Sequence, residues 1–489
     1  MGKSHVMFIG KIADILAKAG HEIVLFQPII DDNITTTGTK LARVIERKRD
    51  FVIDFSFDDL QEDVWSNITT TGTKLARVIE RKRDFVIDFS FDDLQEDVWS
   101  FEEPSFSKLT SMVGRLRSVQ TKSCKNQIND KTLMDQLKSE NFTMSIGEPF
   151  DACYYGVLER LGINTYISAL AGSGMTAAFG GLFGLPSTPS FLPGMFAGMP
   201  PLGYIDRAKN LFGHIMMQYW FPANFINPLN EVLRPVLGHD FEIMHKIAES
   251  SLIFVNADEH LDYPQPTSHK FVNIGGMSMS KPKPLEKKYE EIMNSSRKGV
   301  ILVSFGSVAQ SSKMPEVLKK KFLETFAQFP DITFLWKYEK DEDNIAHGYD
   351  NVITGNWLPQ TDLLAHPKML AFISHGGANS VMEASYAGVP LIGIPLMADQ
   401  FRNAIMAQYR KIATIVQKKE ILEGKLTEAI KKITTDERFG GGGSHDSWLL
   451  PGQHKWMIGG RFIPWGAHRE GFVQMYLDSD LNFSIYAWI

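Results

Sequence analysis

The fold is decided by residues 369–409, which read MLAFISHGGANSVMEASYAGVPLIGIPLMADQFRNAIMAQY. Two apolar runs, Met369–Ser374 and Pro390–Leu396, are each followed by a segment of helical composition, Ala378–Ala387 and Gln400–Tyr409. Strands that alternate with helices of this length are typical of a doubly wound parallel sheet. We therefore predict an α/β fold for this part of the chain.

The same alternation extends upstream to residue 299. Gly299–Ser307 is an apolar run that ends in small residues, and Ile332–Trp336 is another short run of strand composition. Between them, Pro315 opens a segment whose apolar residues recur at helical spacing. The pattern therefore predicts further strands of the same sheet and a helix between them.

Changes in composition mark two boundaries. The stretch Gly275–Pro284 has the composition of a linker, and the regular pattern stops at Phe439, just before four consecutive glycines. We therefore predict three parts, which are an N-terminal domain at 1–275, a C-terminal domain at 276–439 and an atypical tail at 440–489.

The N-terminal part begins with a predicted helix. Its apolar residues Phe8, Ile12 and Leu16 recur at helical spacing, and Glu22–Phe26 then has the composition of a buried strand. A helix that leads into a parallel strand normally follows another strand, because the crossover unit is strand–helix–strand. We therefore expect the first strand of this sheet to be missing from the chain.

Residues 33–66 and 67–100 are identical, and each copy reads NITTTGTKLARVIERKRDFVIDFSFDDLQEDVWS. Two copies are too few for a solenoid, and natural repeats drift in sequence. We expect one copy to belong to the fold and the other to be an insertion. The sequence does not distinguish the two.

Charge and cysteine content exclude several classes of function. The 489 residues carry a formal net charge of −6, which argues against a nucleic-acid partner. The two cysteines, Cys124 and Cys153, are too few for a metal cluster or a disulfide framework. The start of the chain does not resemble a secretory signal. The weakly charged stretch Leu161–Ile205 is rich in proline, so we predict a loop-rich apolar pocket wall there rather than a membrane helix.

Unusual residues follow three of the predicted strands in the C-terminal half. Ser307 and its preceding glycine follow the first, His375 and two glycines follow a later one, and Asp399 and Gln400 follow the last. Ligands of open parallel sheets sit at the carboxyl ends of strands. Glycines allow close approach, and the N–H groups of a helix start favour a diphosphate. Each feature alone is usually a turn or a surface residue, but together they predict a nucleotide-sugar site.

The stretch 356–400, NWLPQTDLLAHPKMLAFISHGGANSVMEASYAGVPLIGIPLMADQ, resembles the signature motif of the UDP-glycosyltransferase family, which includes the animal UDP-glucuronosyltransferases. The resemblance implies a GT-B fold, in which two Rossmann-like domains face each other, with the donor in the C-terminal domain. It implies no metal. The roles that it implies are uracil stacking for Trp357, nucleoside binding for Gln360, diphosphate binding for Ser307, His375, Gly377, Asn379 and Ser380, ribose binding for Glu383, and sugar binding for Asp399 and Gln400.

The N-terminal half resembles the family more loosely. His5 takes the position of the catalytic base, a role that suits a group with a pKa near neutrality. The segment 147–153, GEPFDAC, resembles the family segment that carries the carboxylate partner of this histidine. Alignment on Cys153 gives that position to Glu148, with Asp151 as the alternative. The loop Pro186–Pro193 resembles the acceptor-side loop.

These residues lead us to expect an inverting hexosyltransferase that uses a UDP-sugar and a small lipophilic acceptor, as in detoxification; a homo-oligomer is compatible with it. The alternative is a UDP-sugar-binding pseudoenzyme with a defective acceptor domain. An NAD-dependent oxidoreductase would need a Gly-x-Gly-x-x-Gly turn that the sequence lacks, and an epimerase would not be expected to carry the full 356–400 motif. The family implies the endoplasmic reticulum membrane, although we find neither signal peptide nor transmembrane helix in the sequence.

Overall fold

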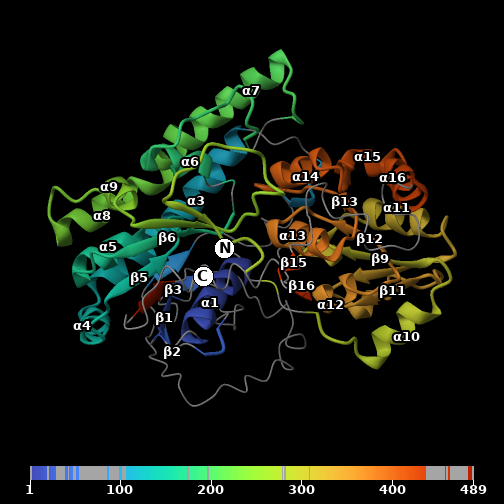
Figure 1. Ribbon diagram of the computed structural model, residues 1–489, viewed down its shortest axis with the longest axis horizontal. Coiled ribbons are helices and arrows are strands. Elements are labelled where there is room, and N and C mark those ends of the chain that lie inside the picture. The colour runs from blue at the N-terminus through green and yellow to red at the C-terminus, as the bar shows by residue number, and fades with distance from the viewer. Residues whose placement is uncertain are drawn as a thin grey trace.

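The structure is a computed structural model. It describes residues 3–18, 21, 23–28, 39–41, 43–47, 51–53, 85–87, 98–101, 106–172, 174, 176–194, 198–277, 279, 282–307, 309–436, 457–458, 461–462 and 483–486. Two parallel sheets, each flanked by helices, form the two halves of the molecule (Figure 1).

The C-terminal sheet has the strand order β11–β10–β9–β12–β13–β14, and all of its strands are parallel. This is the 3-2-1-4-5-6 order of a Rossmann sheet. The predicted strands are confirmed, although β13 is shorter than predicted, and two strands were not predicted. The bounds are β9 Gly299–Ser304, β10 Ile332–Lys337, β11 Val352–Gly355, β12 Met369–Ser374, β13 Leu391–Gly393 and β14 Ala413–Ile415.

Helices cover both faces of this sheet. The predicted helix 378–387 is α13 (Ala378–Ala387), which ends where Gly388 adopts a left-handed conformation with φ 70°. The predicted helix 400–409 is α14 (Gln400–Tyr409), and Pro315 directly precedes α11 (Glu316–Phe326). The other helices of this half are α10 Lys287–Ser295, α12 Gln360–Leu364, α15 Lys418–Leu422 and α16 Lys425–Thr435, with the short 3-10 turns Ser311–Lys313 and Asp341–Asp343.

The N-terminal sheet has the order β2–β1–β17–β5–β6–β7–β8, and it is also parallel. Its central strand β17 comes from the far end of the chain, and in Figure 1 it is the red arrow among the blue strands. The sheet therefore has a strand between β1 and β5, where we expected one to be missing. The bounds are β1 Ile23–Pro28, β2 Arg43–Arg47, β5 Met144–Gly147, β6 Tyr166–Leu170, β7 Leu252–Val255, β8 Phe271–Asn273 and β17 Phe483–Tyr486.

Both copies of the repeat contribute to the described structure. The first supplies β2 to the N-terminal sheet, and its β3 (Phe51–Ile53) pairs in parallel with β4 (Phe85–Ile87), the same three residues of the second copy. The second copy also supplies Val98–Ser100, which lie against the C-terminal half. Within the identical repeat, β2 of the first copy and Val98–Ser100 of the second fall at different positions, so the expectation of one native and one inserted copy stays a prediction. In the tail, β15 (Met457–Ile458) pairs with β16 (Arg461–Phe462).

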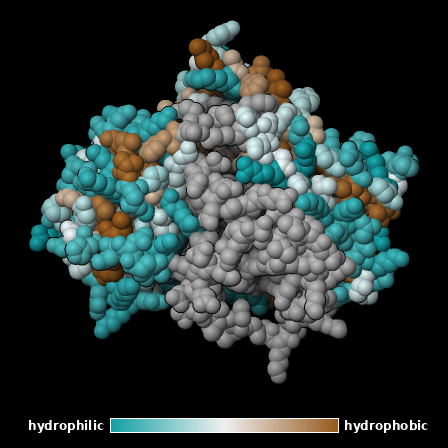
Figure 2. All heavy atoms as spheres, turned by 180° about the vertical axis from the view of Figure 1, so that it is seen from behind, coloured by the Kyte–Doolittle hydropathy of each residue, from teal (hydrophilic) through white to brown (hydrophobic). Residues whose placement is uncertain are grey.

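The helices of the N-terminal half surround its sheet. They are α1 Lys3–Lys18, α3 Phe106–Asn129, α4 Lys131–Ser139, α5 Cys153–Leu161, α6 Thr176–Phe179, α7 Tyr204–Ile215, α8 Pro228–Leu237 and α9 Ile243–Ala248, with a 3-10 turn at Gly180–Phe183 and π-helical turns at Met216–Trp220 and Pro222–Ile226. Helix α7 protrudes at the top of the molecule (Figure 1), and its exposed side chains include Tyr204 and Phe212. Hydrophobic groups are also visible at the top of the molecule in Figure 2. Among the described residues, none of the helices is both long enough and apolar enough to cross a bilayer.

The two halves meet along the segment that follows β7. Arg402 of α14 donates to Asp262 at 2.7 Å, and both side chains are buried, with 4% and 5% exposed. Tyr386 of α13 donates to Asp258 at 2.7 Å. A buried ion pair with good geometry fixes orientation more than it adds stability. These contacts hold the carboxyl ends of both sheets toward each other.

Candidate active site

The donor-side residues lie at the switch point of the C-terminal sheet, where β9 and β12 are neighbours. The loops after these two strands carry Ser307 and His375. A Cβ on Gly306 would lie 2.9 Å from His375 Cε1, and a Cβ on Gly377 would lie 2.6 Å from His375 Nε2. The imidazole is therefore enclosed between the two loops, and α13 begins directly after it. This is the arrangement that cradles a phosphate group.

Burial, together with the charge of Lys337, lowers the pKa of His375 to about 4, although a hydrogen bond to the Ser304 backbone opposes the shift. Nδ1 is buried without a hydrogen-bond partner in the part of the chain that the structure describes. An unpaired buried polar atom is costly, which indicates a place for a polar ligand.

The residues predicted to bind the nucleoside lie together. Gln360 Nε2 donates to Glu383 Oε2 at 2.7 Å and lies 3.4 Å from Ser380 Oγ. Burial raises the pKa of Glu383, and the Gln360 hydrogen bond opposes the shift. Trp357 lies nearby in the sequence and is 52% exposed. Gln360 and Glu383 offer amide and carboxylate groups that can hydrogen-bond to hydroxyl groups.

The sugar-side residues lie where the two halves meet. Asp399 accepts from Asn403 Nδ2 at 2.8 Å, and a Cβ on Gly174 of the N-terminal half would lie 3.7 Å from Asp399 Cβ. Gln400 Oε1 accepts from the backbone N–H groups of Leu396 and Met397, each at 3.0 Å. Gln400 therefore holds its own loop in shape and has only its amide N–H₂ to offer a ligand.

Asn379 also contacts the other half, because Asn256 Nδ2 donates to its Oδ1 at 3.3 Å. The sequence did not single out Asn256, Asn403 or Lys337. Each contacts or influences a residue of the motif. Their positions could have revealed them, because Lys337 ends β10, Asn256 directly follows β7, and Asn403 lies four residues after Asp399.

The structure brings His5 and Glu148 together. His5 Nδ1 lies 2.8 Å from Glu148 Oε2 and 3.0 Å from Oε1, although 143 residues separate them in the sequence. The side chain of Glu148 is 6% exposed and that of His5 is 27% exposed. Burial alone would lower the pKa of His5, but the charge and hydrogen bond of Glu148 and the charge of Asp399 outweigh it, so the pKa is raised. His5 is thus held at one ring nitrogen by Glu148.

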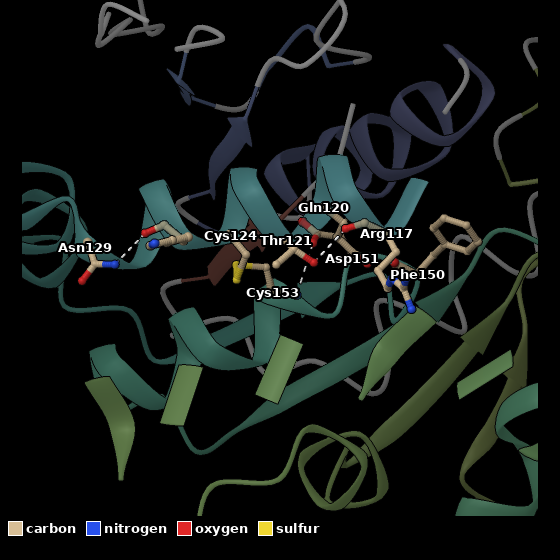
Figure 3. Close-up of a disulfide and its surroundings, with 9 residues drawn as sticks. Arg117, Gln120, Thr121, Cys124, Asn129, Phe150, Asp151 and Cys153 are labelled. Atoms are coloured by element: carbon tan, nitrogen blue, oxygen red, sulfur yellow. Dashed lines mark hydrogen bonds between the residues drawn. A yellow bond between two sulfur atoms is a disulfide. The ribbon is translucent and has the colours of Figure 1, made fainter. Parts of the chain in front are cut away.

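Asp151, the alternative partner, lies elsewhere. Its Oδ1 accepts from the backbone N–H of Cys153 at 3.2 Å, so it stabilises the start of α5. Cys153 is bonded to Cys124 of α3 by a disulfide, and Gln120 Nε2 donates to the Phe150 carbonyl at 2.9 Å (Figure 3). The two cysteines, too few for a framework, thus form a single bridge. It fixes α3 to the turn that follows Glu148.

A pocket adjoins the site on the N-terminal side. Its empty volume is about 590 Å³, including space open to solvent, and Gly174 and Arg402 are among its lining residues. Pro186, Leu192 and Pro193 of the predicted acceptor-side loop also line it. His214 faces the same pocket, and burial lowers its pKa. The wall is mixed, with apolar and polar groups from four segments of the chain.

Comparison with known proteins gives a consistent result. The family described as UDP-glucoronosyl and UDP-glucosyl transferase matches residues 1–441. The relative ugt-48 of Caenorhabditis elegans is 29% identical over 451 residues, which are 89% of this chain and 79% of the relative. UDP-glucuronosyltransferase 3A2 of Homo sapiens is 34% identical over 333 residues, which are 65% of this chain and 60% of that protein.

The fold has solved counterparts. The crystal structure of Os79 from O. sativa in complex with UDP superposes with a TM-score of 0.52 at 17% identity, and the match covers 93% of this chain and 100% of that chain. At this level of identity the match concerns the fold alone, which is the predicted GT-B fold.

Proposed function

The chain belongs to the family of UDP-glucuronosyl and UDP-glucosyl transferases, and from that premise we propose that it moves a glucuronosyl or glucosyl group from a UDP-sugar to a hydroxyl of a small lipophilic acceptor, with inversion at the anomeric carbon. One observation carries the proposal. His5 Nδ1 and Glu148 Oε2 lie 2.8 Å apart, so the N-terminal half assembles a histidine with a carboxylate partner, and Gly174 of the same half lies against Asp399 of the donor side. A base beside a nucleotide-sugar site is the minimum that glycosyl transfer requires.

His5 acts as the general base. Glu148 holds Nδ1, so Nε2 is the atom that takes the proton from the acceptor hydroxyl. The acceptor oxygen forms a bond to the anomeric carbon as the bond from that carbon to the diphosphate oxygen breaks. A single displacement of this kind inverts the configuration. Glu148 stabilises the positive charge that develops on the imidazole.

The leaving diphosphate is stabilised by the switch-point loops. Ser307 is exposed at the end of the β9 loop, and the free N–H groups at the start of α13 point toward the same place as the His375 ring. Preorganised donors of this kind stabilise charge as it develops, so we propose that no metal is needed. Trp357, Gln360 and Glu383 bind the uridine, and Asp399 and the Gln400 amide bind the sugar.

The acceptor pocket beside Gly174 contains apolar groups from the loop 186–193, which favours a small lipophilic acceptor. The family resemblance places such enzymes in the endoplasmic reticulum membrane, and we propose the same location here. The alternative, a UDP-sugar-binding pseudoenzyme, keeps the donor site and lacks transfer.

Titration calorimetry with UDP tests the donor site. We expect saturable binding by the wild-type chain, weakened about tenfold or more in His375→Ala, the usual effect of losing a hydrogen bond to a charged group. Absence of binding by the wild-type chain would overturn the proposal. Transfer from UDP-glucose and UDP-glucuronate to simple phenols then distinguishes the enzyme from the pseudoenzyme.

A further inference from the structure

A short segment of the N-terminal half is buried in the core of the C-terminal half. Val98 and Trp99 are 4% and 1% exposed, and both belong to the apolar cluster that contains Phe305 and Phe322. The chain then returns to the N-terminal half, where α3 starts at Phe106 and packs with Cys124 and Ile128 in the other core. We call residues 98–101 the crossing segment.

Trp99 contacts both ends of the loop that carries Ser307. Its indole N–H donates to the Gln310 carbonyl at 2.9 Å, across 211 residues of sequence. Its ring meets that of Phe305 edge to face, with centroids 5.2 Å apart and an interplanar angle of 78°. Buried aromatic contacts of this geometry add to the energy of burial, and the hydrogen bond fixes orientation. One side chain therefore holds the loop where it leaves β9 and where it approaches α11.

The loop in turn contacts the histidine of the second loop. Gly306 directly follows Phe305, adopts φ +81°, and lies so close to His375 that a Cβ there would come within 2.9 Å of the imidazole. A displacement of Phe305 would therefore move the Gly306 backbone against, or away from, His375. The contacts form a continuous path from Trp99 through Phe305 and Gly306 to both expected diphosphate-binding residues.

The crossing segment is itself clamped. Lys418 Nζ, at the start of α15, donates to the carbonyl oxygens of Val98 at 2.6 Å and of Ser100 at 2.7 Å. The two carbonyls flank Trp99 in the sequence, so the clamp fixes the backbone on both sides of the indole. A partly buried ammonium with two carbonyl acceptors is well satisfied.

We propose that Trp99 is a positioning residue for the donor diphosphate: it fixes the loop 305–310 and so places Ser307 and His375. This inference rests on the proposed function, because it takes the diphosphate to lie between these loops. Trp99 itself touches no substrate. The donor site of the C-terminal half is then completed by a residue from the N-terminal half.

The repeat supplies a matched control. Val64-Trp65-Ser66 in the first copy is identical to Val98-Trp99-Ser100, and it lies outside the described residues. Trp65→Leu removes the same side chain from the same local sequence. In the double variant Trp65→Leu/Trp99→Leu, Trp65 of the first copy cannot take the place of Trp99 in the core of the C-terminal half.

The test measures UDP binding by calorimetry, and KM for donor and acceptor, in Trp65→Leu, Trp99→Leu and the double variant. We expect Trp65→Leu to match the wild type and the double variant to bind UDP about tenfold more weakly, since small misplacements of binding groups are costly. The acceptor KM and the pH at half-maximal rate should not change, because His5 lies in the other half. A merely structural tryptophan would lower the melting temperature and leave UDP affinity below that temperature unchanged.

The results separate the two proposals. Failure of the wild type to bind UDP would remove the proposed function itself. Wild-type binding together with unchanged UDP affinity in the double variant would overturn the role of Trp99 alone. If the leucine variants do not fold, two milder variants test the proposal. Trp99→Phe keeps an aromatic ring and loses the N–H, and Lys418→Met removes the ammonium that holds Val98 and Ser100. Each should weaken UDP binding, and unchanged affinity in both would overturn the role of Trp99.

Discussion

The two halves of this molecule have the same sheet order and very different chain continuity. Numbered from β9 and from β17, both sheets contain the order 3-2-1-4-5-6, and the N-terminal sheet adds β8 as a seventh strand. In the C-terminal half, strand one is β9 and the other five strands follow it in sequence. In the N-terminal half, the place of strand one is taken by β17, whereas the helix that would follow it, α1, begins at Lys3. In the N-terminal sheet the position between β1 and β5 is therefore filled by a strand from a distant part of the chain.

The same difference separates the two parts of the site. The donor-side residues lie in loops directly after β9, β11, β12 and β13 or in the helices that follow, so local sequence places them. The hydrogen bond between His5 and Glu148 joins the start of α1 to the turn after β5. Only the assembled sheet brings these two residues together. We therefore expect changes at His5 or Glu148 to affect transfer and to leave UDP binding intact, whereas changes in the crossing segment 98–101 should affect UDP binding.

The largest effect expected is that of His5→Ala. Loss of the general base should lower kcat/KM by about 10² to 10⁴-fold. UDP affinity, measured by calorimetry, should remain that of the wild type, because the donor loops do not depend on the imidazole. A matched loss of UDP affinity would show that the two halves are not separable, and an unchanged rate would support a different base.

Glu148→Gln should have a smaller effect and a diagnostic pH dependence. A base must be neutral, so the rate rises with pH through the pKa of His5, which Glu148 helps to raise. Removal of the Glu148 charge lowers the pKa of His5, so the pH at which the rate reaches half its maximum should decrease. The plateau rate should fall by about 10- to 100-fold, because the protonated imidazole loses a charged hydrogen-bond partner.

Asp151→Asn provides the control for this profile. Asp151 accepts from the backbone N–H of Cys153 at the start of α5, whereas Glu148 contacts His5, so replacement of Asp151 should leave the pH at half-maximal rate unchanged. If Asp151→Asn shifts the pH at half-maximal rate and Glu148→Gln does not, Asp151 rather than Glu148 is the carboxylate partner of His5.

Sequence predicts the two halves to different depths, for physical reasons. The C-terminal elements were placed from residues such as Met369–Ser374 and Ala378–Ala387 because strand and helix there carry strong local patterns. β14 and β11 are three and four residues long, too short to show a period. Two tertiary features lie beyond local patterns: β17 between β1 and β5, and Trp99 in the other core. Each depends on contacts between segments more than 100 residues apart.

The smallest effect expected on transfer is that of Ser484→Pro, which tests the central strand. Ser484 pairs with Val24 of β1 on one side and with Ser145 of β5 on the other. In a strand with neighbours on both sides, every N–H faces one of the two ladders, and proline has none to offer. The free energy of unfolding, measured with urea, should fall by about 1–3 kcal/mol, the usual cost of leaving a buried partner unsatisfied.

Ser484→Ala keeps the N–H group and is the matched control, so it should lie close to the wild type in stability. The proline variant should also lose more transfer activity than UDP affinity, because α1, which carries His5, packs over β1 and β17. If stability and transfer are both unchanged, β17 is dispensable and the N-terminal sheet tolerates an open centre. If UDP affinity falls in step with transfer, the sheet that holds the base also supports the donor site, and the crossing segment 98–101 is the connection through which it would act.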